Sequence, residues 1–129
     1  MEIETKIFED FVHQWFSDLD ELKETELFLH RLDKHFEFDI YGTKLQGHQG
    51  FISIYESMLV QNNKKAKHIA SNIMVKQIDK QLFEICFDIA LEEKNPDGII
   101  KFRSESIEKW LIQKKTKQLI ILKYAIIKK

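Results

Sequence analysis

The chain has 129 residues, of which 43% are hydrophobic and 32% charged, and these proportions are typical of one globular domain with a sizeable core. The 20 basic and 21 acidic residues almost cancel, so the composition gives no reason to expect a nucleic acid or an anionic membrane as partner. The single cysteine, Cys86, excludes an intramolecular disulfide.

The N-terminal residues give no sign of export or membrane insertion. They read MEIETKIFEDF, which is acidic and lacks the basic start and apolar run of a signal peptide. No apolar stretch approaches the roughly 18 residues that a membrane-spanning helix needs. We therefore expect a cytoplasmic protein that does not enter a membrane.

Helical periodicity dominates the first third of the chain. Apolar residues recur at steps of three and four from Ile7 to Leu22, which predicts one long amphipathic helix. A shorter helical pattern begins at Thr25, whose hydroxyl can cap it. Residues 36–41, FEFDIY, are aromatic and β-branched enough for a short strand, and the GTKLQG that follows predicts a loop. Residues 48–60 place their apolar side chains on one helical face, so we expect a third helix there.

From residue 66 onward the hydrophobic period becomes two, which predicts strands joined by short turns. The strands are expected at residues 66–78, 81–93, 99–112 and 118–128. Helices followed by antiparallel strands predict an α+β fold, in which a cone-shaped, curved antiparallel sheet wraps around the N-terminal helices. The mouth of such a sheet is a usual place for a small-molecule pocket. No repeat or linker divides residues 1–129, so we expect a single domain.

Residues 67–75, KHIASNIMV, combine strand alternation with a polar pair. His68 and Asn72 fall on the same side of a regular strand as Ala70 and Met74. The opposite side carries Ile69, Ile73 and Val75. We expect the first side to face the interior of the cone and the second to face outward.

The strand expected at residues 99–112 predicts a carboxylate inside the core. One of its faces carries four charged residues, so the other face is expected to point inward. The inward face consists of Ile100, Phe102, Ser104, Ser106, Glu108, Trp110 and Ile112. An enclosed Glu108 would have a raised pKa, because burial disfavours the charged form. The alternative is a strand that turns outward near its end and exposes Glu108.

Three stretches resemble the nuclear-transport-factor-2-like superfamily and, within it, the SnoaL-like proteins. They are FDIYGTKLQGHQGFISIYESML, the H-x-x-S-N-x-x-V pattern within KHIASNIMVKQID, and the C-terminal strands that carry Trp110 and end in ILKYAII. The resemblance implies the same cone-shaped fold. It leaves the function open, because this fold carries isomerases, dehydratases, hydrolases, polyketide cyclases and non-catalytic binding modules.

The resemblance also implies catalytic candidates. His68 is similar to the histidine that begins a strand in scytalone dehydratase. Asp39 resembles the general base of ketosteroid isomerase, and Glu108 falls near the protonated aspartate of that enzyme. Strand alternation opposes the assignment of Asp39, since it turns Asp39 outward and the neighbouring phenylalanines inward. The first helix has Trp15 but no tyrosine, so neither full catalytic set is present.

Ligand contacts are expected from aromatic residues that belong first to the core, together with one amide. These are Trp15, Phe51, Tyr55, Phe102, Trp110 and Asn72. The histidines and the cysteine lack metal-ligand spacing, and no glycine-rich phosphate loop or nucleophile elbow is present. We therefore expect neither a metal nor a cofactor.

Two functions remain. The first is a pocket for a small apolar ligand, either as a binding site or for cofactor-free proton transfer, isomerisation, dehydration or cyclisation. In that case His68 is the leading base, with Asp39 or Glu108 as the second group. The second is a non-catalytic homodimeric interaction or binding module that pairs through the outer sheet face, where Ile69, Ile73, Val75, Ile107 and Leu111 are expected.

Overall fold

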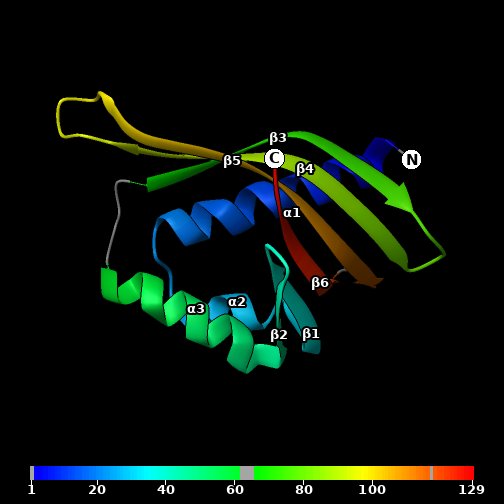
Figure 1. Ribbon diagram of the computed structural model, residues 1–129. Helices are drawn as coiled ribbons and strands as arrows, with labels where there is room; N and C mark the ends of the chain where they lie inside the picture. Colours follow the sequence, from blue (N-terminus) through cyan, green and yellow to red (C-terminus); the bar gives the residue numbers. More distant parts are fainter. Residues whose placement is uncertain (1, 62–65, 117) are drawn as a thin grey trace.

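The computed structural model describes residues 2–61, 66–116 and 118–129 (Figure 1). Within these residues the helices are α1 (Glu2–Asp20), α2 (Thr25–Leu29) and α3 (Gly47–Gln61). The strands are β1 (Leu32–Ile40), β2 (Thr43–Gln46), β3 (Ala66–Gln77), β4 (Leu82–Lys94), β5 (Ile100–Lys115) and β6 (Gln118–Lys128). They form a mixed sheet in the order β2-β1-β6-β5-β4-β3, in which β1 and β6 run parallel and the other neighbours antiparallel. The α+β class predicted from the sequence is confirmed.

Helix α1 lies against one face of the sheet, which we call the inner face, and α2 and α3 lie below it in Figure 1. Helix α1 packs against this face because the contact removes its apolar stripe from water. The buried members of that stripe are Phe8, Val12, Trp15, Phe16 and Leu19. Opposite them, β4 and β5 bury Phe83, Ile85, Phe87, Ile89, Trp110 and Ile112. The opposite face of the sheet, the outer face, has no helix over it in Figure 1.

The segment 42–47 was predicted as a loop, and this prediction is wrong. Residues Thr43–Gln46 form β2, which pairs antiparallel with β1. The connection is a tight turn at Tyr41 and Gly42, whose φ values are 51° and 95°. Positive φ at both central residues is the geometry that matches the twist of a two-residue hairpin. The Gly42 N–H donates to Asp39 Oδ1 at 2.8 Å, which secures the turn.

A β-bulge in β3 overturns part of the predicted inside and outside assignment. The register with β4 shifts between Ser71 and Met74, and Asn72 has a φ of 54°. The extra residue reverses the alternation beyond it. His68 therefore remains on the inner face, but Ile73 and Val75, which were expected outside, pack against the core. Met74, which was expected inside, is instead 70% exposed.

The β4–β5 hairpin extends past the ends of α1 and α3 in Figure 1, and we call residues 91–104 the arm. The inward assignment of β5 holds for Ser106, Glu108 and Trp110, which are buried. It fails for Phe102, which is 50% exposed. Alternation reports which face a side chain is on, but a face is buried only where another element covers it.

A buried ion pair holds α1 to the segment that enters β1. Arg31 Nη2 donates to Asp18 Oδ2 at 2.9 Å, and Gln14 Nε2 donates to Asp18 Oδ1 at 2.9 Å. The Arg31 guanidinium also lies 5.0 Å from the ring centre of Trp15 and 5.1 Å from that of Phe28. Burial lowers the pKa of Arg31, and the Asp18 carboxylate opposes that effect. None of the helices in the described ranges is long and apolar enough to cross a membrane.

We expect Asp18→Asn to lower the free energy of unfolding by about 2 to 3 kcal/mol, because it leaves Arg31 as an unpaired, mostly buried charge. Asp10→Asn on the same helix is the matched control, since Asp10 pairs with Lys6 at an exposed site. Its effect is expected to stay below about 0.5 kcal/mol. Urea denaturation measures both values, and equal effects of the two substitutions would contradict the assigned role of Asp18.

Candidate functional site

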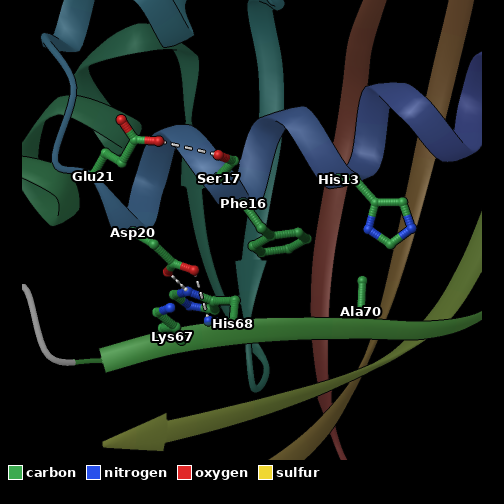
Figure 2. A pocket seen from close by; sticks show the side chains of 8 residues that line it. All are labelled: His13, Phe16, Ser17, Asp20, Glu21, Lys67, His68 and Ala70. Atoms are coloured by element: carbon green, nitrogen blue, oxygen red, sulfur yellow. Dashed lines mark hydrogen bonds and ion pairs between the residues drawn. The ribbon is translucent and has the colours of Figure 1, made fainter.

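A histidine–aspartate pair joins the end of α1 to β3. His68 Nδ1 lies 2.6 Å from Asp20 Oδ1, and the His68 backbone N–H donates to Oδ2 at 2.9 Å (Figure 2). Each side chain is 17% exposed. An ionised carboxylate only accepts, so Nδ1 carries the proton in this bond. Neutral His68 therefore has its lone pair on Nε2, which is the atom that can accept a proton from a bound molecule.

The His68 ring forms part of two separate spaces. Phe16 stacks on it with ring centres 5.1 Å apart. On one side it lines the outer groove, a space of about 630 Å³ formed by His13, Phe16, Ser17, Asp20, Glu21, Lys67, His68 and Ala70. On the other side it lines the inner cavity, a space of about 170 Å³. The walls of the inner cavity are Trp15, Leu19, Phe38, Ile40, Phe51, Ile54, Tyr55, Met58, His68, Glu108, Tyr124 and Ile126.

Glu108 supplies a carboxyl group to the same inner cavity. It is 3% exposed, and Trp110 Nε1–H donates to its Oε1 at 3.0 Å. Burial raises the pKa of Glu108 from its ordinary 4.5 to about 7, against the opposing effects of hydrogen bonds from Trp110 and Tyr124 and of the electrostatic interaction with His68. At neutral pH the cavity therefore contains Glu108 in both its acid and its base form.

The two tyrosines of the cavity differ in what their hydroxyls do. Tyr55 donates to the backbone carbonyl of Lys23 at 2.5 Å, so its ring forms a wall while its hydroxyl is already paired. Burial and the nearby Asp18 charge raise the pKa of Tyr55 to about 12. Burial and the Glu108 charge raise the pKa of Tyr124 well above its usual range, so Tyr124 keeps its proton and faces Glu108 as a donor.

Several residues singled out in the sequence come together at this cavity. His68, Glu108, Trp15, Phe51 and Tyr55 line it. Trp110 lies behind Glu108 and holds the carboxyl through the indole N–H.

The remaining candidates lie elsewhere. Asp39 accepts the Gly42 N–H and lines a separate surface groove with Tyr41 and Lys128. Phe102 is on the arm. Asn72 Nδ2 donates to Asp88 Oδ2 at 2.7 Å on the outer face.

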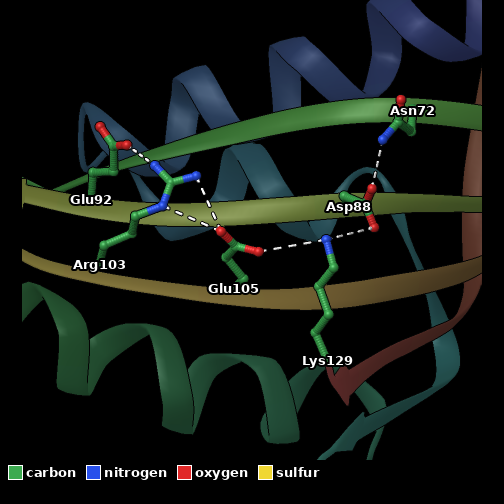
Figure 3. Close-up of polar contacts among 6 residues, drawn as sticks. All are labelled: Asn72, Asp88, Glu92, Arg103, Glu105 and Lys129. Atoms are coloured by element: carbon green, nitrogen blue, oxygen red, sulfur yellow. Dashed lines mark hydrogen bonds and ion pairs between the residues drawn. The ribbon is translucent and has the colours of Figure 1, made fainter.

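That Asn72 bond begins a chain of polar contacts over β3, β4 and β5 (Figure 3). Lys129 Nζ lies 3.6 Å from Asp88 Oδ1 and 3.5 Å from Glu105 Oε1, and Arg103 joins Glu105 to Glu92. The bond from Asn72 is the largest effect that holds the pKa of Asp88 below its usual value, and Lys129 adds to it. Asn72 thus contributes to the outer face rather than to the cavity.

Two residues of this site, Asp20 and Tyr124, were not singled out from the sequence. Asp20 had one usable signal: an acid in the last turn of a helix is unfavourable beside the helix dipole and therefore suggests a partner. No signal in the sequence pointed to Tyr124, because the register between β5 and β6 shifts between Leu111 and Ile112, opposite Leu122. That irregularity places both Ile121 and Tyr124 in the core, which simple alternation cannot produce.

Comparison with known proteins shows which solved structures have a similar fold. No family model and no curated protein matches the sequence. Among solved structures, Aln2 from a Streptomyces species aligns with a TM-score of 0.81 at 12% identity over 98% of this chain and 91% of its own. A candidate scytalone dehydratase from Novosphingobium aromaticivorans gives 0.80 at 11% identity over 96% and 83%. An NTF2-like protein with a cystatin-like fold from the same organism gives 0.76 at 8% identity over 92% and 77%.

Identities this low define the fold alone. The chain has a cystatin-like fold, which it shares with an NTF2-like protein, and the fold that the sequence resemblance implied is confirmed. The chemistry of this chain rests on its own residues.

We expect Glu108→Gln to stabilise the protein at alkaline pH. The folded state holds the Glu108 proton more tightly than the unfolded chain, so this group lowers the free energy of unfolding as the pH rises from 4.5 to about 7. The full effect is about 3 kcal/mol. Urea denaturation of both proteins, at about pH 4.5 and about pH 8, should show similar stabilities at the lower pH and a more stable variant at the higher. A constant difference across that range would contradict the raised pKa.

Proposed function

We propose that the chain binds a small apolar molecule in the inner cavity and transfers protons on it without a cofactor. The observation that carries this proposal is the shared cavity wall: the Asp20-oriented His68 and the buried Glu108 line one apolar space. A base and an acid whose environments differ, held in a cavity of low dielectric, are the components of general acid–base catalysis.

The roles follow from the protonation states. His68 Nε2 takes a proton from carbon beside a carbonyl group, and Asp20 stabilises the imidazolium that forms. Protonated Glu108 gives its proton to another atom of the same molecule. His68 then releases the proton it took to water, and the Glu108 carboxylate takes one from water, so both groups return to their starting forms and no net proton is gained or lost. Returning the proton to carbon gives an isomerisation, and giving it to a hydroxyl leaving group gives a dehydration. The candidate scytalone dehydratase among the similar structures is consistent with this class of reaction.

Deuterium uptake tests the proposed chemistry directly. Phenylacetone, a small apolar ketone, is incubated in D₂O with the protein, and loss of the protons beside its carbonyl is followed by NMR. His68→Gln should slow protein-dependent exchange by roughly 100-fold or more, because it removes the base. His13→Gln is the matched control, since this exposed histidine lies on the same outer groove but not on the inner cavity (Figure 2). Its rate should equal that of the unsubstituted protein.

The pH profile gives a second readout. Exchange that needs the acid form of Glu108 should fall as the pH rises through about 7, and Glu108→Gln should lose that fall. Exchange that is the same with His68→Gln as with the unsubstituted protein would overturn the assignment of His68 as the base.

We also propose that the outer sheet face pairs with a second copy of the chain. Ile69 and Met74 of β3 and Ile127 of β6 are exposed on that face. The polar chain in Figure 3 lies on the same face, over β3, β4 and β5. Interfaces between proteins combine apolar contacts with polar and charged ones. This proposal requires no chemistry in the cavity, and both proposals can hold together.

Met74→Lys should convert the dimer to monomer, because a lysine enclosed in the interface would have to lose its water. Ile78→Lys is the matched control, since Ile78 is exposed in the turn after β3 and off the sheet face. Sedimentation velocity distinguishes the species. A monomer for the unsubstituted protein at high concentration would contradict pairing through this face.

A further inference from the structure

We infer that Trp15 determines which ligand the inner cavity accepts, by donating its indole N–H to an oxygen atom of the bound molecule. The ligand class that follows is a neutral, one-ring carbonyl compound. This inference rests on the proposed use of the inner cavity and adds the substrate class to it. It depends on binding only, so it can be tested apart from the proton-transfer chemistry.

The first observation is an unpaired donor. Trp15 is 0% exposed and lines the inner cavity. In the part of the chain that the structure describes, its Nε1 is the one buried side-chain nitrogen or oxygen atom without a hydrogen-bond partner. Leaving such a donor unpaired costs folding free energy, so its retention in a well-packed core suggests that a ligand uses it.

The second observation is that Trp15 cannot turn to find a partner elsewhere. Its ring packs edge-on against Phe28, Phe51 and Trp110, with ring centres 5.1, 5.8 and 5.7 Å away. The Arg31 guanidinium lies over the ring at 5.0 Å. The indole is therefore fixed in place before any ligand arrives, and a fixed donor discriminates well between ligands.

The third observation is that no nearby protein acceptor, among the described residues, is placed to complete a hydrogen bond with the Trp15 N–H. The Tyr124 hydroxyl is the candidate acceptor: Trp15 lowers the pKa of Tyr124 as a hydrogen-bond donor would, yet the indole N–H does not reach the geometry of a hydrogen bond. The Tyr124 hydroxyl faces Glu108, and Glu108 Oε1 already accepts from Trp110. The Tyr124 oxygen can still accept while its O–H donates, so a carbonyl oxygen in the cavity takes the Trp15 N–H by being better placed than Tyr124.

Volume and charge narrow the class of that molecule. A cavity of roughly 150 Å³ in a protein core holds benzene, and the inner cavity measures about 170 Å³. Its walls, in the described ranges, include no lysine or arginine, and Glu108 already resists ionisation there. A carboxylate ligand would place a second negative charge in this space at a high desolvation cost. A neutral carbonyl oxygen accepts the N–H without that cost.

The test compares ligands that differ in one atom group. Acetophenone presents a carbonyl oxygen, α-methylstyrene replaces that oxygen with a methylene of similar shape, and benzoate replaces the neutral ketone with a carboxylate. Calorimetric titration at about pH 7 should show acetophenone binding roughly five- to tenfold more tightly than α-methylstyrene, which is the contribution of one hydrogen bond. Benzoate should bind more weakly than acetophenone. The ¹⁵N–¹H signal of the Trp15 indole should move downfield with acetophenone and not with α-methylstyrene.

Two substitutions test whether the Trp15 N–H itself determines the preference for acetophenone over α-methylstyrene. Trp15→Phe should bring the affinity ratio of acetophenone to α-methylstyrene close to one. The ratio is taken within each protein, so a general loss of affinity from repacking cancels. Tyr41→Phe is the control, since Tyr41 is an exposed tyrosine in the turn between β1 and β2 that does not line the inner cavity, and it should leave the ratio unchanged.

The inference is overturned if acetophenone and α-methylstyrene bind the unsubstituted protein equally, if neither binds, or if Trp15→Phe keeps the ratio. Discrimination between the two ligands without deuterium exchange of phenylacetone would support the role of Trp15 while rejecting the proposed chemistry. Deuterium exchange of phenylacetone without discrimination between the two ligands would support the proposed chemistry and reject the role of Trp15.

Discussion

The packing of α1 against the inner face of the sheet is the contact on which the rest of this structure depends. Its apolar stripe places Trp15 between the helices and β5, where the Trp15 and Trp110 ring centres are 5.7 Å apart. Its last residue, Asp20, then reaches β3 and binds both the ring and the backbone of His68. One helix thereby fixes the donor and the oriented base of the cavity together. A shift of α1 along the sheet would disturb all of these positions at once, because the aromatic core is close-packed.

Glu108 shows what this arrangement costs in stability. Its carboxyl lies in an apolar cavity, where burial works against ionisation more strongly than Trp110, Tyr124 and His68 together support it. A glutamine or an aliphatic side chain would suit the fold better above neutral pH. Retaining a carboxyl at such a position is characteristic of sites that need an acid near neutrality.

The sequence was sufficient for the class of fold, the long strands and the inward direction of Glu108, because these depend on periodicity sustained over many residues. It was insufficient where one residue changes the period. The bulge at Asn72 reversed the faces beyond it, and the irregularity opposite Leu122 hid Tyr124. Partners distant in the sequence were equally invisible: the distance of 48 residues between Asp20 and His68 leaves no local pattern. Phe102 was placed on the right face but beyond the helices that would have covered it.

His68 stands between the inner cavity and the outer groove, and this position bears on how a base could be reset. A base enclosed on all sides would hold the proton it had taken until the same molecule took it back. Here Asp20, the partner of Nδ1, lines the outer groove, and His68 lines both the outer groove and the inner cavity. Each of the two side chains is 17% exposed. The pair is therefore buried enough for Asp20 to hold the His68 ring in one orientation, and exposed enough for the pair to exchange protons with water. The bulge in β3 separates the surroundings of His68 and Asn72. His68 lies on the inner face, whereas Asn72, four residues later, joins the polar contacts on the outer face.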